Sequence, residues 1–279
     1  MYTQSDVCIV HLSDLHIQSM SQKNAKLSKV LKELVEDIVN HTSNYSECAI
    51  VVSGDTINEA NYSQENKDVV LEFFTKIKKQ IHAKVKEIVF TPGNHDVVRS
   101  EKNYELNLFE MEKNIGDSTF ELCGYKEYLL LINKIRELFE LPEVKTSFYC
   151  SFALINGFQV CFVSLDLAWN TTSDKDKKSS NVAEGLKIGN YQKQFLKDEF
   201  HSMKEPDVVV FVSHYPLSWL NHADYSSLLC ELLSEEGYMA DIYLCGHIHD
   251  VDTINYSTHE KSLLTLVTGI GWPQEFNET

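Results

Sequence analysis

Five short apolar stretches of this sequence each end in Asp, Asn or His, and no other feature constrains the fold as strongly. The stretch over residues 88–90 is typical, because a Pro-Gly pair stops it and a polar triplet follows. The polar residues that follow the five stretches are Asp14 and His16, Asp55, Asn94 to Asp96, His214, and His247 with His249. Apolar runs of this length, bounded by turn residues, are typical of buried strands. Ligands of open α/β sheets bind at the carboxyl ends of strands, so we expect these side chains to meet in one site.

Helical segments lie between these stretches. Apolar residues recur at the spacing of an amphipathic helix over residues 23–40, 69–82, 191–203 and 226–235. An Asn-Gly pair between residues 148–154 and 158–165 predicts an antiparallel hairpin. The alternation of strands and helices indicates an α/β fold, and we expect a single domain over residues 1–279.

The composition is that of an ordinary globular protein, with 43% hydrophobic and 24% charged residues among 279. The net charge of −16 disfavours the broad basic surface with which proteins follow a nucleic-acid backbone. Bound divalent cations would offset carboxylates locally, which leaves a nuclease open. The odd number of cysteines, with Cys8, Cys161 and Cys245 inside apolar strands, indicates reduced core thiols. Without a signal peptide or an apolar run long enough for a membrane, we expect a cytoplasmic protein with no membrane partner.

Two pairs of polar residues have the spacing expected of metal ligands. Asp14 with His16, and His247 with His249, are two residues apart, so in an extended segment both members project to one side. Each pair alone is also compatible with a turn that carries a surface histidine. Imidazole mixed with oxygen ligands, without cysteine, favours manganese, with iron, zinc or nickel as alternatives, over calcium or a structural zinc site.

The segment after the polar triplet breaks the alternation. Arg99 is a candidate phosphate contact, because a guanidinium forks onto phosphate oxygens, although a solvated arginine fits the sequence equally well. Residues 100–147 are helix-rich and densely charged. We predict that they form a helical cap beside the site and contribute to substrate choice.

Taken in order, these motifs resemble the calcineurin-like metallophosphoesterase family. The motifs are Asp14-x-His16, Gly54-Asp55, Gly93-Asn94-His95-Asp96, His214 and Gly246-His247-x-His249. The resemblance runs from residue 7 to about residue 270. It implies a four-layer α/β/β/α sandwich of two mixed sheets with a helical insertion, and a site for two divalent metal ions. At Asn58 the sequence departs from the family, many of whose members carry Asp there.

The resemblance also assigns a role to each motif residue. It implies that Asp14, His16 and His249 hold one metal, that Asn94, His214 and His247 hold the other, and that Asp55 bridges both. It implies further that His95 is the acid or the transition-state contact and that Asp96 orients His95. Arg99 is a candidate for stabilising the developing charge on the chemistry of its guanidinium.

The function expected from this resemblance is hydrolysis of a phosphate ester, most plausibly of a nucleotide or cyclic nucleotide diester. A repair-type DNA or RNA nuclease is the alternative, and a non-catalytic metal-binding scaffold is an alternative of another class. The scaffold reading is disfavoured because every motif residue is intact. We expect Trp272 to form part of the pocket wall. We expect the chain to be either a minimal esterase or the catalytic module of a longer protein with a partner domain or subunit near its C-terminus.

Overall fold

A computed structural model describes residues 6–18, 24–113, 120–171, 185–259 and 261–269. Its first half runs β1 (Ile9–Leu12), α1 (Asn24–Thr42), β2 (Cys48–Ser53), α2 (Gln64–Ile81), η1 (His82–Lys84), β3 (Val85–Thr91), α3 (Glu101–Met111) and α4 (Lys126–Leu138). Its second half runs β4 (Tyr149–Ile155), β5 (Phe158–Leu165), η2 (Ala168–Asn170), α5 (Asn190–Ser202), β6 (Val208–Ser213), η4 (Leu217–Trp219), α6 (His222–Leu233), β7 (Ile242–Cys245), β8 (Asp252–Ser257) and β9 (Ser262–Val267).

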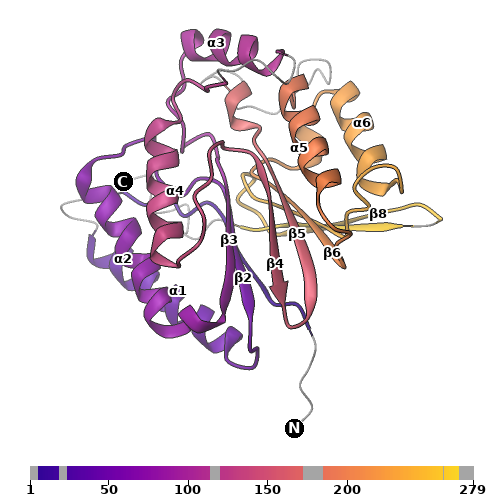
Figure 1. The fold of residues 1–279 in the computed structure, drawn as a ribbon. Helices are drawn as coiled ribbons and strands as arrows, with labels where there is room; N and C mark the ends of the chain where they lie inside the picture. Colours follow the sequence, from indigo (N-terminus) through magenta and orange to yellow (C-terminus); the bar gives the residue numbers. More distant parts are fainter. Residues whose placement is uncertain (1–5, 19–23, 114–119, 172–184, 260, 270–279) are drawn as a thin grey trace.

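The strands form two sheets (Figure 1). In the first, β1, β2 and β3 pair in that order and in parallel, because a crossover helix follows β1 and β2. The second has the order β4-β5-β6-β7-β9-β8, with antiparallel pairs at both ends and parallel pairs between them. Mixed pairing therefore occurs in the six-stranded sheet, and the three strands described for the other sheet are parallel throughout. The predicted hairpin is confirmed as β4 and β5.

Side chains alternate between two cores, as the two-residue period of a strand requires. On β2, Ala49 and Val51 pack with Phe162 and Val210 of the six-stranded sheet, in a core between the sheets. Ile50 and Val52 of the same strand belong to the core beneath the helices. Every residue of β2 is buried, as expected of a strand covered on both faces. The two sheets thus pack face to face, each with a helical layer outside, which confirms the predicted four-layer sandwich.

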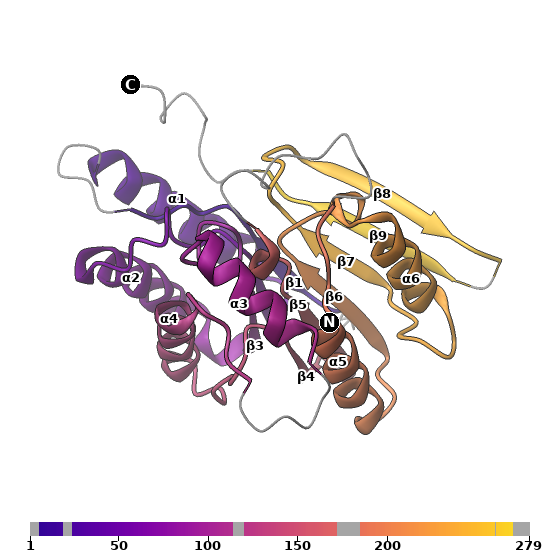
Figure 2. The same ribbon diagram turned by 90° about the horizontal axis from the view of Figure 1, so that it is seen from above.

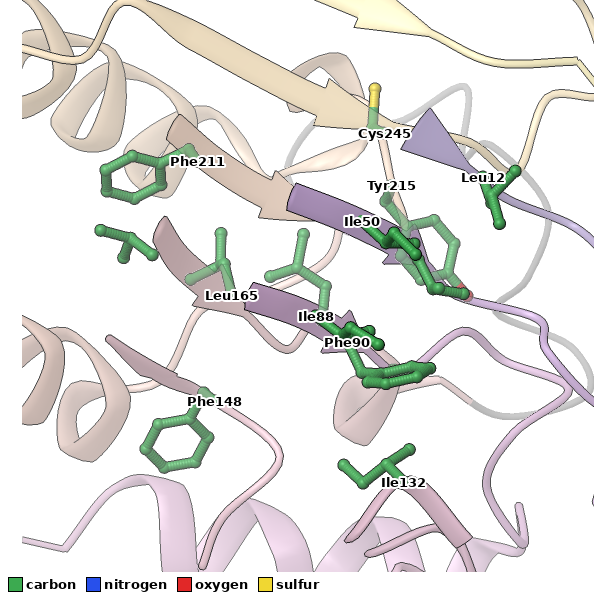
Figure 3. Packing of buried hydrophobic residues seen from close by; sticks show 14 of the residues in the cluster. Leu12, Ile50, Ile88, Phe90, Ile132, Phe148, Leu165, Phe211, Tyr215 and Cys245 are labelled. Carbon is green, nitrogen blue, oxygen red and sulfur yellow. The ribbon is translucent and has the colours of Figure 1, made fainter. Parts of the chain in front are cut away.

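Different helices cover the two outer faces of the sandwich. Figure 2 shows α1, α2 and α4 on one side of the paired sheets and α5 and α6 on the other. Helix α4 packs beside α2 and buries Tyr128, Leu131, Ile132 and Ile135. In Figure 3, the Phe90 ring lies between β3 and Ile132.

One helix of the predicted cap therefore belongs to an outer layer of the sandwich. Within the segment 100–147, residues 126–138 form α4, which completes the outer face of the three-stranded sheet. The remaining helix, α3, lies across the top of the molecule in Figure 1 and contacts η2 and α5. The prediction of a substrate-selecting cap thus applies to α3.

None of the helices in the described part of the chain combines the length and the apolar character that a membrane crossing requires.

Candidate metal centre

The loops that follow β1, β2, β3, β6 and β7 are joined by hydrogen bonds at the strand ends. The backbone N–H of His16 donates to the Asp55 carbonyl at 2.8 Å, and that of Gly246 donates to the His214 carbonyl at 2.9 Å. The N–H of His247 donates to Asp14 Oδ2 at 3.0 Å, which links the first and last motifs across 233 residues. The structure therefore brings the five motifs together, as the sequence predicts.

Three motif glycines stand where a neighbouring residue comes too close to leave room for a side chain. A Cβ atom on Gly93 would lie 2.1 Å from Asp55 Oδ1, and one on Gly54 would lie 2.4 Å from His214 Nδ1. A Cβ on Gly246 would lie 1.9 Å from Ser13 Oγ. Each of these distances is far below van der Waals contact. Gly54 thus lets the backbone come close to the loop that carries His214.

Five of the predicted ligands have a left-handed backbone. The φ angles are 53° for Asp14, 42° for His16, 53° for Asp55, 70° for His247 and 58° for His249. The expectation that the two i, i+2 pairs lie in extended segments is therefore wrong. Both pairs still direct their side chains to the site. Left-handed geometry costs a residue other than glycine about 1–3 kcal/mol and is typical of functional sites.

The first cluster comprises Asp14, His16 and His249. Asp14 Oδ1 lies 3.3 Å from Nε2 of His249 and 3.8 Å from Nε2 of His16. Asp14 Oδ1 and His16 Nε2 are both buried, yet neither has a hydrogen-bond partner. Buried polar atoms without partners are costly, and a cation among these three atoms would satisfy them. The donor set thus fits a divalent transition metal.

The second cluster is centred on the fully buried His214. His214 Nδ1 lies 2.8 Å from the Ser53 carbonyl and donates to it, which directs Nε2 into the site. His214 Nε2 lies 3.2 Å from Asn94 Oδ1, 3.2 Å from Asp55 Oδ2 and 3.1 Å from His247 Nδ1. Four potential ligand atoms therefore converge, and they include all three that the resemblance assigns to the second metal.

Asp55 lies between the clusters. Its Oδ2 atom lies 3.7 Å from His16 Nε2 and 3.2 Å from His214 Nε2. Its Oδ1 atom accepts the backbone N–H of His95 at 2.8 Å. One carboxylate oxygen is thus shared by two groups of histidines, which is the arrangement that a bridging ligand needs.

Without a metal, a proton on His214 balances the negative charge of Asp55 in the second cluster. Burial would lower the pKa of His214, but the charge of Asp55 raises it to about 9. Burial and the charge of His214 lower the pKa of His247 to about 3. Burial would raise the pKa of Asp55, yet His214 holds it well below its usual value. Metal ligation requires an unprotonated imidazole nitrogen, so a cation bound here would displace this proton.

His95 lies beside the first cluster and is held by a neighbouring loop. Its ring centroid is 4.7 Å from that of His16. Its Nδ1 atom accepts the backbone N–H of Glu59 at 3.3 Å, and its carbonyl accepts the N–H of Ala60 at 2.6 Å. Burial lowers the pKa of His95, and the charge of Arg99 acts in the same direction. Arg99 is half-buried and close enough to His95 for this electrostatic effect.

Asp96 is part of the turn that carries His95. Its carboxylate accepts the backbone N–H groups of Gly93 at 2.9 Å and of Ile57 at 3.1 Å. Burial and the charge of Asp55 raise the pKa of Asp96 to about 7. These bonds fix the turn from Gly93 to Asp96 against the loop after β2, so Asp96 sets the position of His95 through the backbone.

Two aromatic residues beside the second cluster were not predicted. The ring centroids of Tyr215 and Trp219 lie 4.3 Å and 4.4 Å from that of His247. The sequence signal was present, since both follow His214 within five residues, but aromatic residues are far more often core than site. The predicted wall residue Trp272 lies outside the described residues. Asn58, at the position where the sequence departs from the family, donates from Nδ2 to Gln18 Oε1 at 3.0 Å.

Comparison with known proteins agrees with this geometry. A model of the calcineurin-like phosphoesterase family matches residues 8–251. The uncharacterized metallophosphoesterase-like protein YydB of Bacillus subtilis is 21% identical over 273 residues, which are 94% of this chain and 53% of YydB. The chain thus spans about half the length of that relative.

Two solved structures show limited similarity. A dimetal phosphatase of Danio rerio aligns with a TM-score of 0.49 and 15% identity, over 96% of this chain and 89% of its own. The sulfate thiohydrolase SoxB of Thermus thermophilus aligns with a TM-score of 0.48 and 13% identity, over 95% and 52%. The family model carries the assignment, because it matches most of the chain and includes all five strand-end motifs: this chain belongs to the calcineurin-like phosphoesterase family.

Proposed function

We propose that this chain uses two divalent metal ions to hydrolyse phosphodiesters, and that both ions are manganese. The first ion would be held by Asp14, His16 and His249, the second by Asn94, His214 and His247, with Asp55 bridging. The observation that carries the proposal is the position of Asp55 Oδ2, which faces histidines of both clusters. A shared carboxylate is what holds two cations close enough to act on one phosphate.

When bound, the two cations supply an activated water and neutralise charge that develops on the phosphoryl oxygens. His95, at the edge of the first cluster, is placed to donate an N–H to the leaving oxygen. Asp96 keeps the His95 turn in position through its bonds to Gly93 and Ile57. Arg99 adds a positive charge on the same side, where a guanidinium can contact a phosphate oxygen.

Our proposed substrate is a nucleotide or cyclic nucleotide diester, and our proposed location is the cytoplasm. The net charge of −16 supports a small substrate over a long polyanion such as DNA. The expected partner near the C-terminus stays a prediction, because residues 270–279 lie outside the described part of the chain.

A substrate panel with Mn²⁺ tests the proposal. The purified protein is assayed with bis-p-nitrophenyl phosphate, p-nitrophenyl phosphate, cyclic mono- and dinucleotides, and single- and double-stranded DNA. We expect the diesters and at least one nucleotide class to be hydrolysed, and DNA to be left intact. Asp14→Ala should abolish turnover, whereas Asp252→Ala, an exposed position on β8, should not.

Three results would overturn parts of the proposal. Absence of turnover on every ester by protein loaded with two Mn²⁺ would remove hydrolysis itself. A monoester cleaved faster than its matched diester would make the chain a phosphomonoesterase. Cleavage of DNA with a preference over nucleotides would favour the nuclease alternative.

A further inference from the structure

Trp219 is the solvent-facing member of an aromatic pair beside the second cluster. Its ring lies edge-on to that of His247, with an interplanar angle of 89° and a centroid distance of 4.4 Å. Tyr215 contacts the same imidazole but is fully buried, whereas Trp219 is half-buried. Trp219 therefore has indole surface that neither the core nor His247 covers.

The backbone on both sides of Trp219 is fixed. The N–H of Trp219 donates to the Pro216 carbonyl at 3.0 Å, which closes η4. The carbonyl of Trp219 accepts the N–H of Leu186 at 2.9 Å, and the Leu186 carbonyl accepts the N–H of Asn221 at 2.9 Å. The neighbouring Leu220 is buried and forms a bridge with Leu186. A ring held in this way is a preorganised surface, which loses little conformational entropy when a ligand binds.

We infer that Trp219 is a specificity-determining residue, against which a planar aromatic group of the ester, such as a nucleobase, packs while its phosphoryl group lies at the two clusters. This inference rests on the proposed function. His247 belongs to the second cluster and contacts Trp219 through its ring, so the indole lies directly beside that cluster. An aromatic group attached to a bound phosphoryl group therefore reaches Trp219 directly. Stacking on aromatic side chains tolerates any base, because every base has a π face.

A purely structural role for Trp219 makes a different prediction. If the indole served only to hold His247 in place, its loss would weaken metal binding and would weaken all phosphoryl ligands equally. If it contacts the aromatic group, its loss weakens aromatic ligands selectively and leaves metal affinity unchanged.

A pair of phosphonates distinguishes these two roles in a binding measurement that involves no turnover. Phenylphosphonate and methylphosphonate share the phosphoryl group, contain no ester to hydrolyse, and differ by the aromatic ring. Their affinities for the Mn²⁺-loaded protein are measured by calorimetry for the unchanged chain, Trp219→Leu and Trp219→Phe. The leucine variant keeps apolar bulk without a ring, and the phenylalanine variant keeps a smaller ring. Tyr45→Leu is the matched control, because Tyr45 is a half-buried aromatic residue just before β2, at the amino end of a strand whose carboxyl end carries the site.

The unchanged chain should bind phenylphosphonate about tenfold more tightly than methylphosphonate, a difference typical of one stacked aromatic group. Trp219→Leu should remove this preference with unchanged Mn²⁺ affinity, Trp219→Phe should retain part of it, and Tyr45→Leu should retain all of it. A preference that survives in Trp219→Leu, or is absent from the unchanged chain, overturns the inference. So does a loss of Mn²⁺ affinity with an equal loss for both phosphonates. If neither phosphonate binds and no ester is turned over, the proposed function is wrong, and this inference is wrong as well because it rests on that function.

Discussion

The Oδ2 atom of Asp55 lies 3.2 Å from Nε2 of His214, and both side chains are almost completely buried. In water such a pair contributes little, but burial strengthens its electrostatic attraction considerably. His214 donates from Nδ1 to the Ser53 carbonyl, so its other nitrogen can face only Asp55 and the remaining ligands. The hydrogen bond to Ser53 thus fixes the orientation of His214 towards Asp55, as expected of a metal ligand.

Replacement of the shared carboxylate should affect both metals. Asp55→Ala removes the one oxygen that faces both clusters, so we expect the affinity for each of two Mn²⁺ ions to fall by more than about tenfold. Calorimetric titration of the metal-free protein gives both affinities and the stoichiometry. Asp68→Ala, on the exposed side of α2, is the control. Retention of two tight sites in Asp55→Ala would show that Asp55 does not bridge.

His95 should matter for turnover and not for metal binding. His95→Ala removes a donor beside the first cluster, and a positioned acid is typically worth ~10²–10⁴-fold in rate. We expect that loss in kcat on a diester with a poor leaving group, with two Mn²⁺ still bound. The loss should shrink for p-nitrophenyl esters, whose leaving group needs no proton. A decrease of less than about fivefold on the poor leaving group would remove the proposed role.

Gly93 should not tolerate a methyl group. Gly93→Ala would place Cβ 2.1 Å from Asp55 Oδ1, so either Asp55 or the turn of His95 must move. We expect loss of Mn²⁺ binding even if the protein still folds. Gly157→Ala is the matched control, because it lies in the hairpin of β4 and β5 with φ at +91° and nothing within 4 Å. It should destabilise the protein by about 1 kcal/mol and leave metal affinity unchanged. Equal metal affinity in both variants would contradict the close-approach argument.

The sequence predicts those elements whose apolar pattern is strong. Strands β2 and β6 end where expected, because the motif Gly54-Asp55 follows β2 and His214 follows β6. Helices α2 and α6 begin five and four residues earlier than their apolar stripes predict. Their starts are set by caps, since the Ser63 hydroxyl accepts the N–H of Asn66 and the Asn221 side chain accepts the N–H of Asp224.

Other elements had no usable signal. Strand β8 was not predicted, because it lies at the edge of its sheet and most of its side chains are exposed, which leaves no apolar alternation. The position of α4 beside α2 is a tertiary choice that an amphipathic pattern cannot specify. The seven predicted ligands and His95 could be named from residue type and order. The left-handed backbone of five of them could not be predicted, because only the packing of the loops imposes it.

A buried carboxylate outside the predicted set of ligands gives a test of the fold itself. Asp166 follows β5, is completely buried, and accepts hydrogen bonds from the hydroxyls of Ser147 and Tyr125 and from two backbone N–H groups of η2. Burial raises the pKa of Asp166 to about 7, far above its usual value, despite these donors. The folded protein therefore keeps a proton that the unfolded chain gives up. A raised pKa of this kind stabilises the fold at low pH, and that contribution is lost as pH rises towards the folded pKa.

Asp166→Asn mimics the protonated carboxyl and should remove this dependence. The free energy of unfolding of the unchanged chain minus that of Asp166→Asn should fall by about 1.4 kcal/mol per pH unit between pH 5 and pH 7, and level off above it. Denaturant unfolding of both metal-free proteins at each pH gives this difference, in which other titrating groups cancel. Asp68→Asn, in an exposed position, should show a constant difference from the unchanged chain. A constant difference for Asp166→Asn as well would mean that the surrounding donors keep Asp166 ionised throughout, and that its hydrogen bonds outweigh its burial.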